Sequence, residues 1–186
     1  MCRPSFDPTS MSYFEHTIDG LSLDLAHLEP RELVFFVKKL NRELAIEVKF
    51  TNHCFTVDFK DGLHDPKHLI WDHKRRRAYD PERHALSRRL PDLIDALPTA
   101  AVYLTPTDRN YVYLANVVLP DGRHYPIYFH LRRAQASGRQ RLLLVVESAY
   151  PRSDRQAILV GTTKISFPIL CAKVYRGEPI RPQARR

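Results

Sequence analysis

The sequence predicts one α+β domain, in which a single central antiparallel sheet has two main helices packed against it. Three observations predict this class. Apolar and polar residues alternate with a period of two over 44–50 and 124–131, as in half-buried strands. Short connections such as 120–123 favour antiparallel pairing of successive strands. Proline and acidic residues stand where two helices would begin, and 186 residues suffice for one core.

The N-terminal part, residues 11–59, is predicted to form strand, helix and strand. A short hairpin would turn at Asp19-Gly20. Pro30 lies near a first helical turn with acidic neighbours, and the apolar positions that follow have helical spacing. These positions are Leu33, Phe36, Val37 and Leu40. Residues 44–59 alternate as a strand that breaks near Thr51-Asn52 and then resumes.

The middle of the chain predicts a loop and then a helix. Residues 60–79 have several turn-forming pairs and the charge run 74–77, so we expect a long basic loop. Asp80 is the expected N-cap of the following helix, with Pro81 at its first position. Pro91 predicts a kink or two consecutive short helices.

Residues 80–175 are expected to add this helix and most of the antiparallel sheet. Strands are predicted over 100–104, 111–119, 124–131 and 142–150. The first face of 124–132 is apolar, and the second face contains polar side chains, namely His124, Tyr128, His130 and Arg132. Both faces of 142–146 are apolar, so this strand should be central.

The ends of the chain have simpler predictions. Residues 164–175 predict a strand, or a strand with a terminal helix, and Pro168 restricts the strand to an edge or a break. Residues 176–186 form a basic tail that should fray. Residues 1–10 are expected to be a disordered leader, and either Met1 or Met11 could be the true start.

The charge distribution favours a polyanionic partner. The chain has a formal net charge of +8, but the first sixty residues have more acidic than basic side chains, so the basic excess lies later. Basic clusters without an amphipathic basic helix favour nucleic acid, RNA before DNA, over a membrane; a protein partner remains possible. The three cysteines lack CxxC spacing and no apolar run could span a membrane, so a cytoplasmic location is expected.

Motifs for bound cofactors are missing from the sequence. Phosphate-binding glycine loops and the GxSxG hydrolase elbow are absent. Five histidines and Cys54 lie between 53 and 84, but no pair has an established zinc-ligand spacing. We therefore expect no cofactor and no metal, and any cleavage of RNA would use side chains alone.

Several short motifs lie in the order basic helix, middle strand and strand end. They are Arg83-His84 before 90–94, Tyr128-Phe129-His130, and Ser148-Ala149-Tyr150. Residues 79–151 thereby resemble the group of small metal-independent ribonucleases that includes barnase, EndoU, the tRNA-cleaving colicins and RelE-type toxins. The resemblance implies an antiparallel sheet preceded by helices and an endoribonuclease of toxin- or phage-associated type. It implies site roles for His84, Arg132, Ser148 and Tyr150.

Residue chemistry adds His130 to this candidate catalytic set, because imidazoles serve as acid or base at neutral pH. The expected phosphate contacts are basic side chains of two segments, namely Lys74, Arg75, Arg76, Arg77, Arg83, Arg88 and Arg89. The alternative is a non-enzymatic nucleic-acid- or protein-binding module. Each candidate also has an ordinary structural explanation, as a helix-surface histidine, a strand-end hydroxyl or a rim cation.

Overall fold

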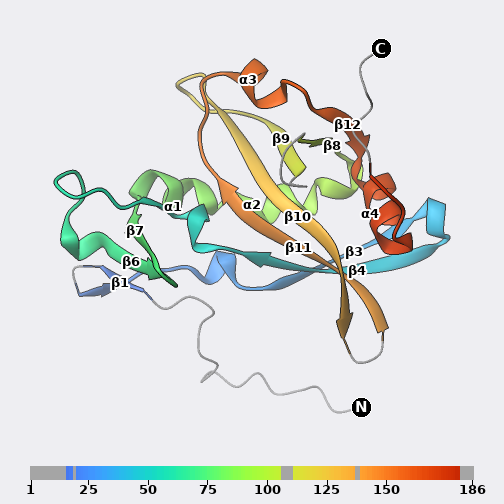
Figure 1. Cartoon of the computed structure of the whole chain (residues 1–186), viewed down its shortest axis with the longest axis horizontal. Coiled ribbons are helices and arrows are strands. Elements are labelled where there is room, and N and C mark those ends of the chain that lie inside the picture. The colour runs from blue at the N-terminus through green and yellow to red at the C-terminus, as the bar shows by residue number, and fades with distance from the viewer. Residues whose placement is uncertain (1–15, 19, 106–110, 137–138, 181–186) are drawn as a thin grey trace.

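The strands of this protein form three separate sheets. The computed structural model describes residues 16–18, 20–105, 111–136 and 139–180 (Figure 1). The largest sheet has seven strands in the order β12-β8-β9-β10-β11-β4-β3. Its members are β3 (Arg31–Val37), β4 (Arg42–Phe50), β8 (Ala101–Leu104), β9 (Tyr111–Val118), β10 (His124–Ala136), β11 (Arg139–Ala149) and β12 (Thr163–Ser166).

Two smaller sheets come from the first half of the chain. One is the predicted N-terminal hairpin of β1 (Thr17–Ile18) and β2 (Leu21–Ser22). The other has the order β5-β7-β6, with β5 (Thr56–Asp58), β6 (Leu69–Asp72) and β7 (Arg75–Tyr79). The α+β class is confirmed, but the prediction of one central antiparallel sheet with two main helices is wrong. Besides the extra sheets, β4 and β11 pair in parallel.

The prediction of a helix after Pro30 is also wrong, because this segment forms β3. Leu33 and Val37 are buried, whereas Val34 and Phe36 are about half exposed, so burial alternates along a strand. β-Branched and aromatic residues favour that conformation. β3 returns into β4 through the 3₁₀ turn η2 (Lys38–Leu40), and Asn41 takes the left-handed conformation, with φ 51°.

The predicted loop at 60–79 contains two strands. A 3₁₀ turn, η4 (Pro66–His68), leads into β6, and β6 and β7 pair antiparallel through a turn at His73, whose φ is 51°. Turn-forming residues at both ends of these short strands conceal them in the sequence. The strand break near Thr51 is confirmed, because η3 (Asn52–Cys54) separates β4 from β5.

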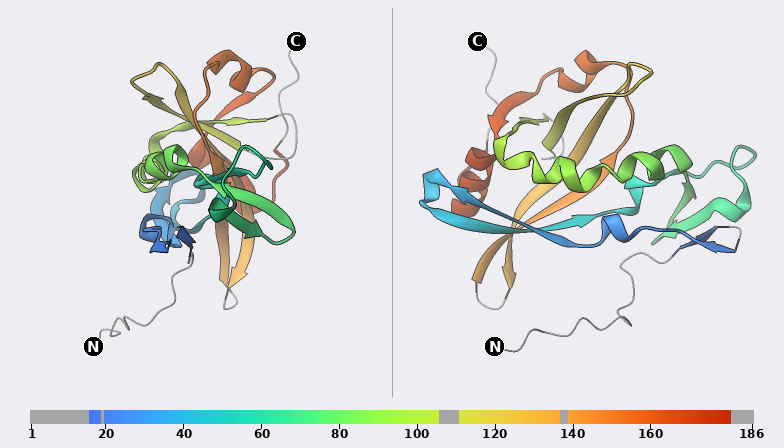
Figure 2. Two further views of the ribbon diagram at one scale, coloured as in Figure 1. Left: turned by 90° about the vertical axis from the view of Figure 1, so that its left-hand side faces the viewer. Right: turned by 180° about the vertical axis from the view of Figure 1, so that it is seen from behind.

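Short helices cover the large sheet. α1 (Pro81–Ser87) and α2 (Leu90–Asp95) lie end to end across it, as the view from behind in Figure 2 shows. The predicted cap is confirmed, since the Asp80 side chain accepts a hydrogen bond from the Arg83 backbone N–H. The longest helix is α4 (Phe167–Arg176), which follows the edge strand β12 and buries Phe167, Leu170 and Cys171 in the core. Two 3₁₀ turns, η1 (Ala26–Leu28) and η5 (Leu97–Thr99), and α3 (Arg155–Leu159) complete the elements.

The two strands with the clearest sequence pattern have the predicted burial. Tyr125, Ile127 and Phe129 of β10 are fully buried. β11 lies between β10 and β4, and its apolar residues Leu142–Leu144 are buried. The predicted connector between them is shorter than expected, because the strands extend to Ala136 and from Arg139. The predicted leader 1–10 and residues 181–186 of the predicted tail lie outside the described residues.

Candidate functional site at the end of the parallel strand pair

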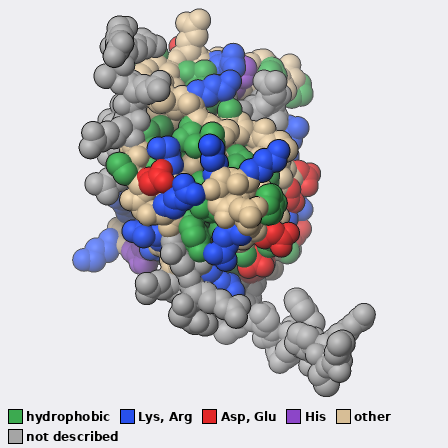
Figure 3. Space-filling view, turned by 90° about the vertical axis from the view of Figure 1, so that its right-hand side faces the viewer, with side chains coloured by type: hydrophobic (Ala, Val, Ile, Leu, Met, Phe, Trp, Pro, Cys, Tyr) green, Lys and Arg blue, Asp and Glu red, His purple; other side chains and the backbone are tan. Residues whose placement is uncertain are grey.

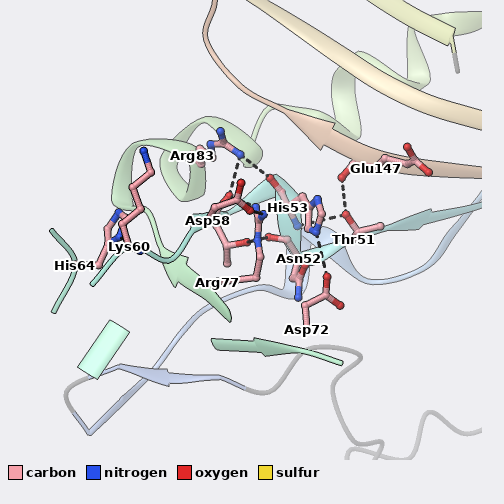
Figure 4. Close-up of polar contacts among 11 residues, drawn as sticks. Thr51, Asn52, His53, Asp58, Lys60, His64, Asp72, Arg77, Arg83 and Glu147 are labelled. Carbon is pink, nitrogen blue, oxygen red and sulfur yellow. Dashed lines mark hydrogen bonds and ion pairs between the residues drawn. The ribbon is translucent and has the colours of Figure 1, made fainter. Parts of the chain in front are cut away.

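The parallel strands β4 and β11 end together, and polar residues follow both ends. Phe50 is the register partner of Val146. Beyond this pair, the backbone N–H of Thr51 donates to the Val146 carbonyl at 3.0 Å, and its hydroxyl donates to the Glu147 carbonyl at 2.6 Å (Figure 4). The carboxyl ends of neighbouring parallel strands are a frequent position for binding sites.

A β-bulge alters the direction of β11 at this point. Phe129 pairs with Val146 and Tyr128 pairs with Ser148, so Glu147 is the extra residue of the bulge. The Glu147 carboxylate lies 2.7 Å from Nε2 of His130, and both side chains are partly exposed. Bulges often redirect side chains beside active sites. Here the bulge is next to a histidine–carboxylate pair.

Two tyrosines and two arginines lie next to this pair. The rings of Tyr128 and Tyr150 are stacked, with centroids 5.4 Å apart and planes at 17°. The guanidinium carbons of Arg83 and Arg152 lie 4.7 Å and 5.9 Å from the centroid of the Tyr150 ring. Burial raises the pKa of Tyr128, and the neighbouring Tyr150 raises it further, so the Tyr128 hydroxyl stays protonated at neutral pH.

Arg83 connects this cluster to the rest of the fold. Its Nη1 donates hydrogen bonds to the carbonyls of Thr56 at 2.8 Å and His53 at 3.3 Å (Figure 4). The ring of His53 in turn contacts the Asp72 carboxylate at 3.1 Å. The helix α1 therefore meets the end of β11. We call Arg83, Tyr128, His130, Glu147, Tyr150 and Arg152 the bulge site.

His84, the first predicted catalytic residue, lies in another cluster. Its Nε2 donates to the Asp24 carbonyl at 2.9 Å, and its Nδ1 contacts the Tyr79 hydroxyl at 3.0 Å. Its ring also lies 5.8 Å from that of His27. Within the described residues, the contacts of Tyr150 do not include His84. The structure therefore brings Arg83, instead of His84, to the predicted site.

The other predicted catalytic residues lie along the two strands. His130 and Tyr150 belong to the bulge site. Ser148 is half-buried and stands opposite Tyr128 in the register. Arg132 is exposed two residues beyond His130, on the same side of β10. Three of the five predicted residues therefore lie on these neighbouring strands, and Tyr150 directly follows β11.

The predicted phosphate contacts differ in their availability. Arg77 is 5% exposed, and its guanidinium bonds to Thr56 and Asp58, so this arginine is part of the fold and cannot serve as a surface phosphate contact. Arg76 pairs with Asp61, and Arg88 pairs with Asp24. The remaining predicted cations, Lys74, Arg75 and Arg89, are exposed.

The sequence analysis missed three members of the bulge site as site residues. Tyr128 was expected on the polar face of its strand, but nothing in the pattern indicated the bulge at Glu147 that brings these residues together. Arg152 lies in a polar segment without periodicity. Two mutual backbone hydrogen bonds with His124, of 2.8 Å and 2.7 Å, hold this segment beside β10. The only local indication that Arg152 belongs to the site was Tyr150, the aromatic residue directly before Pro151.

Basic side chains also cover the face around α4. Figure 3 shows Lys and Arg side chains spread among hydrophobic ones on this side of the molecule. Arg42 donates a hydrogen bond to the Tyr175 hydroxyl at 2.9 Å, and Arg176 donates to the Lys39 carbonyl at 2.7 Å. The Arg133 guanidinium lies close to Gly177 at the end of α4. The basic excess is therefore distributed over several faces.

Two further findings concern the described residues. No group of three or more His, Cys, Asp or Glu side chains among them is arranged to hold a metal ion. No described helix has the length and apolar character needed to cross a bilayer.

Comparison with known proteins identifies one family. Neither the curated proteins nor the solved structures include a significant match to this chain. The sequence model of the YjaZ family matches residues 15–175, which include every strand and helix described above except the last residue of α4. The chain belongs to the YjaZ family.

Proposed function

We propose that this protein acts on RNA and cleaves it at the bulge site without a metal ion. The observation that supports this proposal is the contact of 2.7 Å between His130 and Glu147, beside the stacked Tyr128 and Tyr150. An acid–base group, hydroxyl donors and cations are the groups that metal-free cleavage of a phosphodiester needs.

The His130–Glu147 contact defines a role for the imidazole. In a neutral ring, Nε2–H donates to the Glu147 carboxylate, which leaves the lone pair on Nδ1. Nδ1 would accept the proton of a ribose 2′-hydroxyl as the 2′-oxygen forms its bond to phosphorus. The bond from phosphorus to the 5′-oxygen breaks, which yields a 2′,3′-cyclic phosphate and a 5′-hydroxyl end. Glu147 orients the ring and stabilises its charged form.

The other groups of the bulge site fit the phosphate and the leaving oxygen. Tyr150 would donate a proton to the departing 5′-oxygen. The protonated Tyr128 hydroxyl would donate a hydrogen bond to a phosphate oxygen. Arg83 and Arg152, which both lie near the Tyr150 ring, would stabilise the additional negative charge of the phosphorane. Arg132 and Ser148, on the same strands, would contact neighbouring phosphates.

RNA is the proposed substrate because this chemistry uses the 2′-hydroxyl, which DNA lacks. The net charge of +8 supports a polyanionic partner. A cytoplasmic location is part of the proposal, since three cysteines without CxxC spacing suit a reducing compartment.

A non-enzymatic RNA-binding module is the second candidate. The exposed Lys74, Arg75 and Arg89 lie outside the bulge site, and phosphate contacts there would support binding without cleavage. In this case the Tyr128–Tyr150 stack and its arginines would bind phosphate, and the His130–Glu147 pair would have a structural role.

Incubation of mixed RNA with purified protein in EDTA tests both candidates. We expect wild-type protein to produce 2′,3′-cyclic phosphate ends, and His130→Gln and Tyr150→Phe to reduce the rate by about 100-fold or more. Lys164→Gln, an exposed change on β12, is the control and should cleave normally. His84→Gln should also retain activity if the protein remains folded. RNA that stays intact with wild-type protein would contradict the enzyme, and binding that depends on salt would then favour the module.

A further inference from the structure

Trp71, the only tryptophan of the chain, lies on the surface of the small sheet β5-β7-β6. Its exposed fraction is 61%. A tryptophan at this exposure leaves a large aromatic area in water. The described contacts of Trp71 do not include an aromatic ring that covers it. Its indole is therefore accessible to a partner.

The neighbours of Trp71 form a row across the three strands. Arg76 of β7 is its direct register partner, so their side chains lie on the same face. The guanidinium carbon of Arg76 lies 5.2 Å from the ring centroid of Phe59, which follows β5. The backbone N–H of Phe59 donates to the Arg76 carbonyl at 3.1 Å, which fixes the order of the row. An aromatic, a cation and an aromatic are thus adjacent.

A further cation lies next to this row. Lys74 is exposed at the turn that joins β6 to β7, and Arg75, the register partner of Asp72, is exposed on the opposite face of the sheet. The carboxylate of Asp61 neutralises Arg76. Neither Lys74 nor Arg75 has an ion pair with another described residue. A stacking surface with free positive charge beside it is the arrangement by which proteins bind single-stranded nucleic acid.

We infer that the sheet β5-β7-β6 is a stacking platform for single-stranded RNA, in which Trp71 stacks on a base and Lys74 contacts a phosphate. The inference rests on the proposed action on RNA and adds a second contact for the same substrate. It explains both the exposed indole and the charge run that precedes the buried Arg77. Base–aromatic stacking depends little on sequence, so the platform would hold RNA without selecting a base.

The platform is connected to the bulge site through a chain of contacts. Asp72, the residue after Trp71, contacts the His53 ring, and the His53 carbonyl accepts a hydrogen bond from Arg83. Figure 4 shows these side chains between the small sheet and the end of β11. This chain reaches the face of β6 opposite to Trp71, because successive strand residues alternate, so an RNA strand would pass around the edge strand β6 to reach the platform.

An apolar docking site for a protein is the competing interpretation. Leu63, on the loop before β6, is 70% exposed and could extend an apolar patch. The charges favour RNA, because Lys74 lies closer to Trp71 in the chain and would be left without a counter-charge against an apolar partner. Binding of a protein, in place of RNA, at the surface around Trp71 is one outcome of the test.

The single tryptophan permits a direct test. The full-length protein is titrated with a 12-residue oligouridylate and, separately, with inorganic polyphosphate, while the Trp71 emission is measured. We expect the oligouridylate to quench the emission, because its bases stack on the indole, and polyphosphate to bind with little quenching. Equal quenching by both, or none with the oligouridylate, would overturn the inference.

Variants measure the contribution to affinity, with labelled RNA and fluorescence anisotropy. Trp71→Ala should weaken binding about 5- to 100-fold, whereas Trp71→Phe should keep most of it. Phe36→Ala, which removes another half-exposed aromatic on β3, is the matched control and should bind normally. An unchanged Kd for Trp71→Ala would overturn the platform. Circular dichroism of each variant confirms that the fold is retained.

The platform and the proposed cleavage fail in different ways. If RNA quenches Trp71 but stays intact, the platform is supported and the cleavage proposal is contradicted. If RNA is cleaved but never quenches Trp71, cleavage is supported and the platform is overturned. At saturating RNA, Trp71→Ala should cleave at the wild-type rate, since Trp71 lies outside the bulge site. A protein or anionic vesicle that shifts the emission while RNA does not would overturn the inference in favour of another partner.

Discussion

The Arg83 guanidinium lies over the ring of Tyr150, with its carbon 4.7 Å from the ring centroid. The same side chain donates hydrogen bonds to the carbonyls of His53 and Thr56. One arginine therefore joins α1, the turn after β4 and the end of β11. Arg83 therefore holds α1 in place against the bulge site.

Substitution of Arg83 should affect both stability and RNA binding. Arg83→Gln removes the cation and its contact with the ring, leaves the His53 carbonyl without this donor, and takes one of two arginine donors from the Thr56 carbonyl. We expect the free energy of unfolding to fall by about 1–3 kcal/mol. Arg83→Lys keeps the charge but lacks the planar group, so it should recover only part of the loss. Urea unfolding measures the change, and Arg89→Gln, at an exposed position, should alter it by less than about 0.5 kcal/mol.

Arg77 and Arg76 are adjacent in sequence but should differ in their contribution to stability. The buried Arg77 guanidinium donates to the Thr56 hydroxyl at 3.0 Å and to the Thr56 carbonyl at 2.9 Å. Arg77→Met removes the donor to the Thr56 hydroxyl and one of the two arginine donors to the Thr56 carbonyl, and we expect a loss of about 2–4 kcal/mol. Arg76 pairs with the exposed Asp61, so Arg76→Met should cost less than about 1 kcal/mol. Similar losses in urea unfolding would contradict this difference.

Local sequence features predicted those elements whose determinants are also local. Asp80 and Pro81 define the start of α1, and alternation defines β10. β3 was mistaken for a helix because Leu33 and Val37 are four residues apart. Residues at this spacing lie on the same side of both a helix and a strand. The parallel pairing of β4 with β11 joins segments far apart in the chain, and no local pattern specifies it.

The candidate site, like the fold, was predicted where its determinants are local in the sequence. Strand alternation and strand ends identified His130, Ser148 and Tyr150. The choice between Arg83 and His84 depends on the rotation of α1, because successive helical residues point about 100° apart. The bulge at Glu147 depends on pairing with β10 and has no signature in β11 itself.

His27 should make the protein less stable as the pH falls. Its Nε2 contacts the Ser87 hydroxyl at 2.7 Å, and its Nδ1 is buried without a partner among the described residues. Burial lowers the pKa of His27 to about 4, and repulsion from Arg88 and His84 adds to this. The unfolded chain binds the proton near pH 6.5, before the folded protein does. This contribution to stability is therefore complete above pH 6.5 and is lost as the pH falls toward 4.

Urea unfolding at several pH values checks the His27 prediction. Between pH 6.5 and 4, the stability of wild-type protein should fall more steeply than that of His27→Gln, which has no titrating ring. Lys164→Gln, an exposed change on β12 that leaves His27 and its Ser87 contact intact, should keep the wild-type slope. Equal slopes for the wild type and His27→Gln would show that another group determines the acid sensitivity.

The buried cysteines should report on RNA binding at the bulge site. Burial raises the pKa of Cys54 to about 12 and raises that of Cys171 also, so neither thiol is ionised at pH 8 in the folded protein. In a Cys2→Ser variant, a disulfide reagent should react with the two remaining thiols only through opening of the structure.

Cys54 belongs to the turn after β4, where its thiol donates to the Val146 carbonyl at 3.8 Å, next to Glu147. Oligouridylate that binds at the bulge site should stabilise this turn and slow the reaction of Cys54 more than that of Cys171 on α4, as measured by mass spectrometry of the labelled peptides. Equal slowing of both thiols would instead indicate global stabilisation, and no slowing at saturating RNA would place the RNA elsewhere on the protein.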